Sequence, residues 1–272
     1  MKFLRIVIIV LFVFSLGIFG YSRYVEYQKT DETLPVISGS NESLKIPCVY
    51  DESQLLEGIV AYDEKDGDLT EEIMIGNISR FHDKGKCKVT YIVFDSSNQA
   101  ATFVREIEFT DYQSPEFIFT EPLVFKKGTS VNINGYVGAL DVLDGDISSL
   151  VRITDSNVNY QTAGEYEIKI EVTNSFGDYS ERIFPVHVVE AVDTRYKIQL
   201  SENLVYLKKG SKFNASDYVE QVIRDDGMQA DKNSVAIKSG VDVNEPGLYE
   251  VKYTYDDGNG NRGATWQTVI VE

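Results

Sequence analysis

Two acidic turns carry the side chains that are best suited to chemistry in this chain. The turns read DEKDGD and DVLDGD, and their carboxylates belong to Asp63, Asp66, Asp68, Asp141, Asp144 and Asp146. Three carboxylates so close together repel one another at neutral pH unless a cation or hydrogen-bond donors compensate their charge. Ca²⁺ is a suitable ion, because it accepts about six to eight oxygen ligands in a flexible geometry. These residues are therefore candidate calcium ligands.

A purely structural interpretation of the same turns stays open. Asp is favoured in turns because its side chain accepts hydrogen bonds from nearby backbone N–H groups. Gly67 and Gly145 can supply the positive φ that such a turn often needs. The spacing also differs from that of an EF-hand loop. We expect no required cofactor, with calcium as the one possible ion.

Support for catalysis is thin. His82 falls in a polar loop, and His187 lies in the strand-like segment FPVHVV, where we expect it to face solvent. The sequence contains no Gly-x-Ser-x-Gly, His-Glu-x-x-His or phosphate-binding glycine loop. We therefore expect no catalytic residue and no enzymatic activity.

The acidic turns are landmarks of a longer internal repeat. The turn recurs after 78 residues, and a glycine that opens the next long strand recurs after 79. A third, more divergent copy keeps Asp226, while Ile223 and Met228 replace the outer carboxylates, so we expect no acidic site there. Internal repeats have to be identified before the fold is inferred, because they determine the number and the length of the domains. The predicted organisation is an N-terminal segment (1–30), repeat one (31–110), repeat two (111–190) and repeat three (191–272).

Each repeat contains a strand with strict period-two alternation. In repeat two, Tyr166, Ile168 and Ile170 alternate with charged residues, and residues 87–93 and 249–255 follow the same pattern. Turn-rich spacers such as DSSN and DDGNGN follow these strands and lead into a closing strand, which predicts a hairpin. No stretch after residue 30 keeps a helical period for long. The sequence predicts an all-β fold of three tandem antiparallel sandwiches.

Residues 1–30 differ from the rest of the chain. Lys2 and Arg5 precede an apolar run from Ile6 to Phe19, which is typical of a signal anchor or a signal peptide. Tyr24 lies where interfacial aromatic residues usually occur. We predict a single-pass protein of the cell membrane with its later domains outside. Secretion after signal cleavage is the alternative.

The two cysteines both belong to repeat one. Cys87 holds an inward position of the alternating strand, and Cys48 shares the parity of Leu44 and Ile46 in an earlier strand. Two inward cysteines in an exported domain can form a disulfide. A pair of buried thiols is the alternative interpretation, so Cys48 and Cys87 are a candidate disulfide.

Several sequence segments after residue 30 resemble a known family. The segments LEGIVAYDEKDGDLTEEI, KVTYIVFDSSNQAA and FVREIEF are similar to the immunoglobulin-like (Ig-like) domains of bacterial cell-surface proteins, a type also found in some insecticidal crystal proteins. The resemblance spans residues 31–272 and implies Ig-like sandwiches. Repeat two departs from the pattern at Thr173-Asn174, where repeat one has Phe94-Asp95. Such modules serve many proteins, so the resemblance implies little about function.

Charge limits the possible partners. The chain carries a formal charge of −17, while its first 30 residues are net positive, and an acidic surface repels nucleic acid and anionic lipid. We expect a non-enzymatic adhesive or spacer stalk at the bacterial surface, with three modules in line, each about 30 Å long. The alternative is a ligand-binding ectodomain of a sensory or surface complex, which would use Trp266, tyrosine faces or strand edges. The expected partner is a cell-surface protein or polysaccharide.

Overall fold

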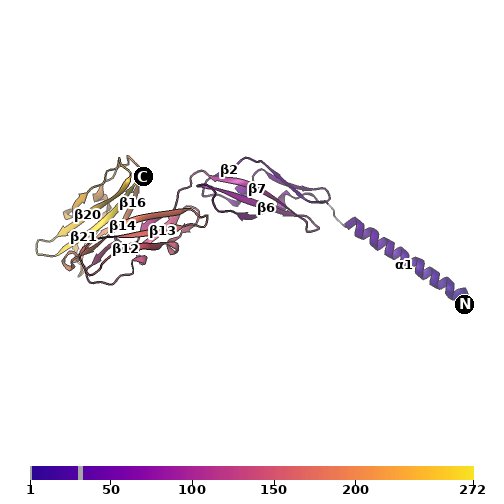
Figure 1. Cartoon of the computed structure of the whole chain (residues 1–272), viewed down its shortest axis with the longest axis horizontal. Coiled ribbons are helices and arrows are strands. Elements are labelled where there is room, and N and C mark those ends of the chain that lie inside the picture. Colours follow the sequence, from indigo (N-terminus) through magenta and orange to yellow (C-terminus); the bar gives the residue numbers. More distant parts are fainter. Residues whose placement is uncertain (1, 30–32) are drawn as a thin grey trace. The chain divides into compact units, whose positions relative to one another are not determined.

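The computed structural model describes residues 2–29 and 33–272, so the predicted boundary between residues 30 and 31 lies outside the described residues. One N-terminal helix is followed by a series of β-sandwiches (Figure 1). Each repeat contributes one three-stranded and one four-stranded sheet. The predicted all-β fold of tandem sandwiches is confirmed.

Helix α1 (Lys2–Lys29) is apolar along most of its length. Its segment Phe3–Glu26 has a mean hydropathy of 2.6, and 0% of it is buried against the rest of the chain. At 1.5 Å per residue this segment is about 36 Å long, enough to cross a hydrocarbon core of about 30 Å. It is the one helix among the described residues that is long and apolar enough to cross a membrane, and a signal sequence has the same features.

Repeat one is built around its longest alternating pair of strands. Cys87, Val89 and Tyr91 point inward from β6 and are fully buried, while their neighbours are more exposed. β6 pairs with β7 in an antiparallel hairpin, as the sequence predicted. The elements of repeat one are β1 (Val36–Gly39), β2 (Leu44–Ile46), α2 (Glu52–Leu55), β3 (Ile59–Asp63), β4 (Gly67–Asp68), η1 (Thr70–Glu72), β5 (Met74–Ile78), β6 (Lys86–Phe94) and β7 (Ala100–Phe109).

Repeat two has its own core between its two sheets. Ile168 and Ile170 from the alternating strand β13 pack with Phe184 of β14, and Phe117 of β8 meets the Phe184 ring edge-on at 5.8 Å between centroids. The elements of repeat two are β8 (Glu116–Phe119), β9 (Val124–Lys126), η2 (Ile133–Gly135), β10 (Val137–Asp141), β11 (Gly145–Asp146), η3 (Ser148–Leu150), β12 (Arg152–Ser156), β13 (Gly164–Thr173) and β14 (Tyr179–Val189).

Repeat three repeats the plan with a separate core. Val251 and Tyr253 of β20 are fully buried, and the Tyr253 hydroxyl is satisfied by the carbonyl of Ala215 and the side chain of Gln267, at 2.9 and 2.8 Å. The elements of repeat three are η4 (Ala191–Asp193), β15 (Tyr196–Leu200), β16 (Leu204–Leu207), η5 (Ala215–Tyr218), β17 (Val219–Arg224), β18 (Gln229–Ala230), η6 (Lys232–Ser234), β19 (Ala236–Ser239), β20 (Gly247–Asp256) and β21 (Arg262–Val271).

The sandwiches are not wholly antiparallel, in contrast to the prediction. Each four-stranded sheet contains one parallel pair, formed by β2 and β7, by β9 and β14, and by β16 and β21. The reason lies in the connection after the first strand of each repeat. The chain leaves the three-stranded sheet there and joins the edge of the other sheet beside the last strand, which runs in the same direction.

The chain divides into two compact units, Met1–Asp111 and Tyr112–Glu272. Within the second unit, β14 of repeat two runs beside β21 of repeat three (Figure 1). His187 meets Trp266 at one place along these strands, and Arg182 meets Glu272 further along, so the strands run in opposite directions. The prediction that the modules lie in line is wrong for these two repeats. They pack side by side because the outer faces of their sheets are apolar enough to be buried.

Candidate functional site

A buried histidine marks the seam between repeats two and three, where the outer face of β14 meets the outer faces of β20 and β21. His187 is 6% exposed, and its Nε2 lies 2.7 Å from Oε1 of Glu250. Its ring stacks on Trp266, with centroids 4.0 Å apart and an interplanar angle of 11°. The prediction that His187 faces solvent is wrong, because repeat three covers its face of β14.

The sequence indicated this seam through runs of consecutive apolar residues, which the search for alternating strands did not use. Val186, His187 and Val188 are consecutive and all buried, and residues 267–271 of β21 are buried without interruption. A strand that is covered on both faces loses its alternation and is apolar throughout. The runs FPVHVV and TVIV have this character, and so they indicated strands with two covered faces.

The middle of the seam is apolar and its edge is charged. Ile270 of β21 is fully buried and belongs to the core cluster of repeat two. Nearby, the hydroxyl of Tyr206 accepts a hydrogen bond of 2.9 Å from the backbone N–H of Phe117, and burial raises the pKa of Tyr206 to about 12. The ion pairs at the edge are Arg182 with Glu272 at 2.6 Å and Lys197 with Glu121 at 3.0 Å.

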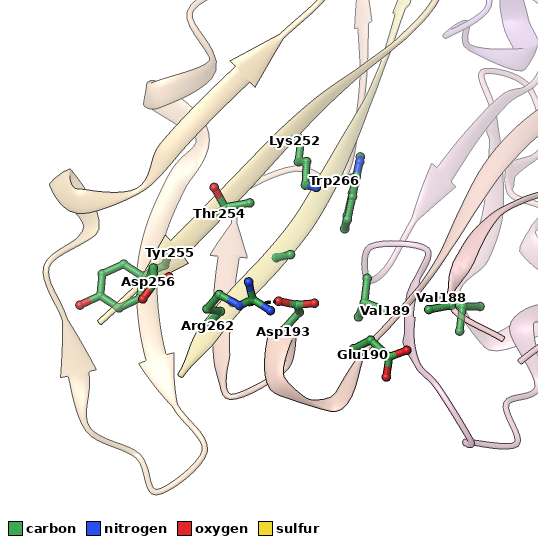
Figure 2. Close-up of a pocket in the computed structure, with 13 residues that line it drawn as sticks. Val188, Val189, Glu190, Asp193, Lys252, Thr254, Tyr255, Asp256, Arg262 and Trp266 are labelled. Carbon is green, nitrogen blue, oxygen red and sulfur yellow. Dashed lines mark ion pairs between the residues drawn. The ribbon is translucent and has the colours of Figure 1, made fainter. Parts of the chain in front are cut away.

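A pocket of about 470 Å³ opens at one end of this seam. Val188, Val189 and Glu190 line the side that belongs to repeat two, and β20 and β21 line the other side, as Figure 2 shows. In the lining, Nε of Arg262 lies 2.9 Å from Oδ1 of Asp193 (Figure 2). The pocket therefore combines an apolar wall with paired charges.

The aromatic ring at the edge of this pocket is already engaged. Trp266 carries the stacked ring of His187, and Nζ of Lys252 lies 4.7 Å from the centroid of Trp266. The other charged groups of the lining include Lys252, Glu190 and Asp256. Oε1 of Glu190 lies 3.0 Å from Nζ of Lys127, and Oδ1 of Asp256 accepts a 2.8 Å hydrogen bond from the N–H of Gly258. Such a set suits a polar ligand held by hydrogen bonds more than one stacked on an open tryptophan face.

Each carboxylate of the acidic turns has its own hydrogen-bond partners. Oδ1 of Asp63 accepts hydrogen bonds from the N–H groups of Lys65 and Asp66, at 2.8 and 3.0 Å, and Asp141 does the same in repeat two. Asp68 accepts from the N–H of Thr70, and Asp146 from that of Ser148. These contacts with Thr70 and Ser148 hold the pKa values of Asp68 and Asp146 below the usual range. Gly67 and Gly145 have φ of 81° and 72°, as the turn interpretation predicted.

The middle carboxylate of each turn connects it to the turn after the long strand. Asp66 accepts hydrogen bonds from both N–H and Oγ–H of Ser96, and Asp144 accepts the same pair from Ser175. Among residues 2–29 and 33–272, no group of three or more His, Cys, Asp or Glu side chains is placed to hold a metal ion. The structure thus gives each predicted calcium ligand a turn-forming role and does not gather the three carboxylates of a turn.

Sequence reasoning missed a buried network in repeat two. Nδ2 of Asn174 donates to Oδ2 of Asp141 at 3.0 Å and to the hydroxyl of Tyr112 at 2.8 Å. The Tyr112 hydroxyl in turn donates to Asp178 at 2.8 Å, and burial together with this hydrogen bond raises the pKa of Tyr112. The sequence signal for this network was Asn174, which stands where repeat one has Asp95. An amide that can donate a hydrogen bond replaces a carboxylate there.

The candidate disulfide is not formed. Cys48 and Cys87 are both buried and are not bonded to each other. Leu44 of β2 and Cys87 of β6 pair with Ile107 of β7 from opposite sides, so β2 and β6 are roughly 10 Å apart. A disulfide needs Cα atoms within about 7 Å. Burial raises the pKa of the Cys87 thiol to about 11, so this thiol is protonated at neutral pH.

The other histidine lies at the surface of repeat one. Nε2 of His82 is 3.1 Å from Oε2 of Glu106, and both side chains are about 40% exposed, at 43% and 39%. The prediction that His82 lies in a polar loop agrees with the structure.

Comparisons with known proteins show what the chain is similar to. The pesticidal crystal protein Cry22Aa of Bacillus thuringiensis is 31% identical over 271 residues, which cover 94% of this chain and 35% of that protein. An 81.3 kDa protein of Acholeplasma phage L2 is 33% identical over 137 residues, which cover 49% of this chain and 18% of that protein. The chain therefore spans about a third or less of the length of these relatives.

A solved structure and a family model also match the chain. A structure of Drosophila N-cadherin EC1-3 matches at 10% identity with a TM-score of 0.32, covering 90% of each chain. Residues 198–271 match the model of the family described as bacterial surface protein, Ig-like domain. These residues belong to repeat three, the copy with the most divergent acidic turn. The match confirms the predicted resemblance to the Ig-like domains of bacterial surface proteins.

Proposed function

We propose that this is a non-enzymatic surface protein that α1 holds at a bacterial membrane, with its Ig-like repeats outside as an adhesive or spacer. The observation that carries this proposal is the apolar segment Phe3–Glu26, of which the rest of the chain buries nothing. A lipid bilayer would cover such a segment, whereas water would not tolerate it. The acidic exported part agrees with display in an aqueous environment.

The seam between repeats two and three supports the spacer or adhesive role. Ile270 is fully buried in the seam, and hydrogen bonds and ion pairs surround it. Such a contact resembles a domain core more than a flexible hinge, so the two sandwiches present a fixed surface. A fixed surface lowers the entropy cost of binding a partner, which is what an adhesive domain needs.

Attachment can be tested by expressing the full chain with a C-terminal epitope in a bacterium. The expected result is a full-mass protein in the membrane fraction, whose epitope is removed when intact cells are treated with protease. Val10→Arg combined with Val13→Arg should release it, because each charge at the centre of a spanning helix costs about 2.5–3.5 kcal/mol. Arg23→Ala, near the end of α1, is the matched control. A shortened protein in the medium would instead establish cleavage and contradict anchoring.

A second function, ligand binding, is favoured by the pocket at the seam. Its wall of Val188 and Val189 and its hydrogen-bonding groups, such as Lys252, suit a small polar molecule. Binding can be tested by screening bacterial polysaccharide fragments against the full chain in detergent micelles, with Lys252→Ala and the exposed Lys88→Ala as a matched pair. Binding that Lys252→Ala removes and Lys88→Ala keeps would support this function. Equal binding by both variants would place the ligand elsewhere.

A further inference from the structure

Two equivalent positions carry different residues in the three repeats. One is the first residue of the acidic turn, and the other is the first residue of the turn that follows the long strand. In repeat two the pair is Asp141 and Asn174, whose Oδ2 and Nδ2 atoms are hydrogen-bonded at 3.0 Å. In repeat three the pair is Arg224 and Asp257, because Val222 pairs with Ile198 as Ala139 pairs with Phe117, which puts Arg224 at the place of Asp141. Oδ2 of Asp257 accepts a 2.7 Å hydrogen bond from Asn261. Each of these pairs contains one carboxylate, and that carboxylate has a donor.

Repeat one keeps two carboxylates at this pair, and both are deeply buried. Asp63 is 1% exposed and Asp95 is 6% exposed. Oδ1 of Asp95 accepts from the N–H groups of Ser97 and Gln99, at 2.8 and 2.7 Å, just as Oδ1 of Asp63 accepts within its own turn. Among the described residues, however, Oδ2 of Asp63 and Oδ2 of Asp95 are both buried and accept no hydrogen bond.

Two buried carboxylate oxygens without a donor need a positive charge. An ionised carboxylate that loses water without gaining a partner is strongly destabilised, and two like charges side by side increase the cost. The hydrogen-bonded pair of repeat two occupies the same two backbone positions, which indicates that the Oδ2 atoms of repeat one face each other. The two Oδ1 atoms hold the carboxylates in place through backbone N–H groups, so the pair is preorganised.

We propose that a divalent cation, with Ca²⁺ as the physiological candidate for an exported domain, binds between Oδ2 of Asp63 and Oδ2 of Asp95. One such ion neutralises both carboxylates. Ca²⁺ lies only about 2.3–2.6 Å from its oxygen ligands, which is closer than a water probe approaches, so oxygens that are closed to water can still hold it. Further oxygen ligands would complete the coordination that Ca²⁺ requires.

This site differs from the calcium candidates that the turn sequence suggested. It uses Asp63 from that turn but takes its second carboxylate from Asp95, more than thirty residues later in the chain. Asp66 instead fixes the distance between the two turns through its hydrogen bonds to Ser96. The inference predicts one ion per chain, in repeat one, because repeats two and three each contain only one carboxylate at the pair. The choice of Ca²⁺ among divalent cations rests on the proposed export of the repeats, whereas the site itself does not.

The test uses the full chain in detergent micelles, first stripped of metal with EDTA and then titrated with CaCl₂. Calorimetry should give one Ca²⁺ per chain, and the thermal transition of residues 1–111 should rise by about 5–10 °C when Ca²⁺ is well above its Kd. Asp95→Asn copies the pair of repeat two, so it should fold and lose both responses. Asp68→Asn, an exposed carboxylate of the same turn, should keep them.

Two outcomes would overturn the proposal. The first is a wild-type protein that neither binds Ca²⁺ in the titration nor melts at a higher temperature with it. The second is an equal response in wild type and Asp95→Asn, which would place the ion elsewhere.

Discussion

Single side chains decide how each repeat compensates its buried charge. Asp63 and Asp141 occupy equivalent places and cap their turns in the same way, yet Asn174 gives Asp141 a donor while Asp95 gives Asp63 a second negative charge. The exchange of one carboxylate oxygen for an amide nitrogen therefore separates a self-contained network from one that needs an external ion. Local sequence pattern identifies the turn, but only the fold reveals which residue faces it.

Removal of the buried histidine should destabilise the second unit. His187→Ala leaves Glu250 without its hydrogen bond and Trp266 without its stacked ring, and we expect a loss of about 1–3 kcal/mol in the free energy of unfolding. Urea denaturation followed by Trp266 fluorescence measures this loss. His82→Ala removes a half-exposed ion pair and should change stability by no more than about 0.5 kcal/mol. Equal effects of the two variants would contradict the structural role of His187.

The Cys87 thiol should react slowly in the folded protein. It is fully buried, and its pKa is raised to about 11, so little thiolate exists at pH 8. In a Cys48→Ser variant, which leaves Cys87 as the one thiol of the chain, a disulfide reagent such as Ellman's should label it at least about 100 times more slowly in buffer than in guanidinium. Fast labelling of the folded variant would show that the strand opens readily.

At the scale of elements, alternation predicted strands well where one face meets water. β6, β13 and β20 alternate in the sequence and are buried on one face, as expected. The same reasoning misjudged β14, because alternation disappears when a second domain covers the outer face. The candidate site at the seam could not be predicted from the sequence. A seam depends on which two outer faces pack together, and local sequence patterns contain no information about that.

The buried isoleucine of β21 should be important to this seam. Ile270→Ala removes apolar contacts with the core of repeat two and leaves a cavity, so we expect a loss of about 2–4 kcal/mol in the free energy of unfolding of residues 112–272. Ile183→Ala is the matched control, because Ile183 lies on β14 but is 53% exposed. Chemical denaturation of both variants measures the difference. A cost for Ile270→Ala as small as that of its control would show that the seam contributes little.

The seam should also weaken in strong base. The pKa of Tyr206 is raised to about 12 in the folded protein by burial, against about 10 in the unfolded chain, so folding favours the neutral phenol. The resulting stability is fully present below pH 10 and is lost as pH rises from about 10 to 12, by up to about 2 kcal/mol. Urea midpoints measured between pH 8 and 11.5 should fall more steeply for wild type than for Tyr206→Phe. Parallel slopes would contradict a buried hydroxyl at this position.

At the scale of the molecule, the tandem order was predictable and the packing was not. Internal repeats and turn spacing established the number and class of the sandwiches. They could not reveal that repeats two and three lie side by side, because Ile270, His187 and Trp266 occupy outward positions of their strands. The third sandwich therefore lies beside the second, and its strand β21 contributes Ile270 to the core of repeat two. The predicted domain boundaries at residues 110 and 190 remain predictions.

Heating the whole chain should reveal how far this coupling extends. Residues 112–272 form one compact unit with a buried seam between its two sandwiches. Differential scanning calorimetry in detergent should therefore show one transition for repeats two and three together and a separate one for residues 1–111. Ile270→Ala should lower the shared transition by about 5–10 °C and leave the other unchanged. Three separate transitions, or a shift that affects repeat three alone, would mean that the sandwiches touch without unfolding together. In that case the second unit would be a flexible pair rather than a fixed surface for an adhesive partner.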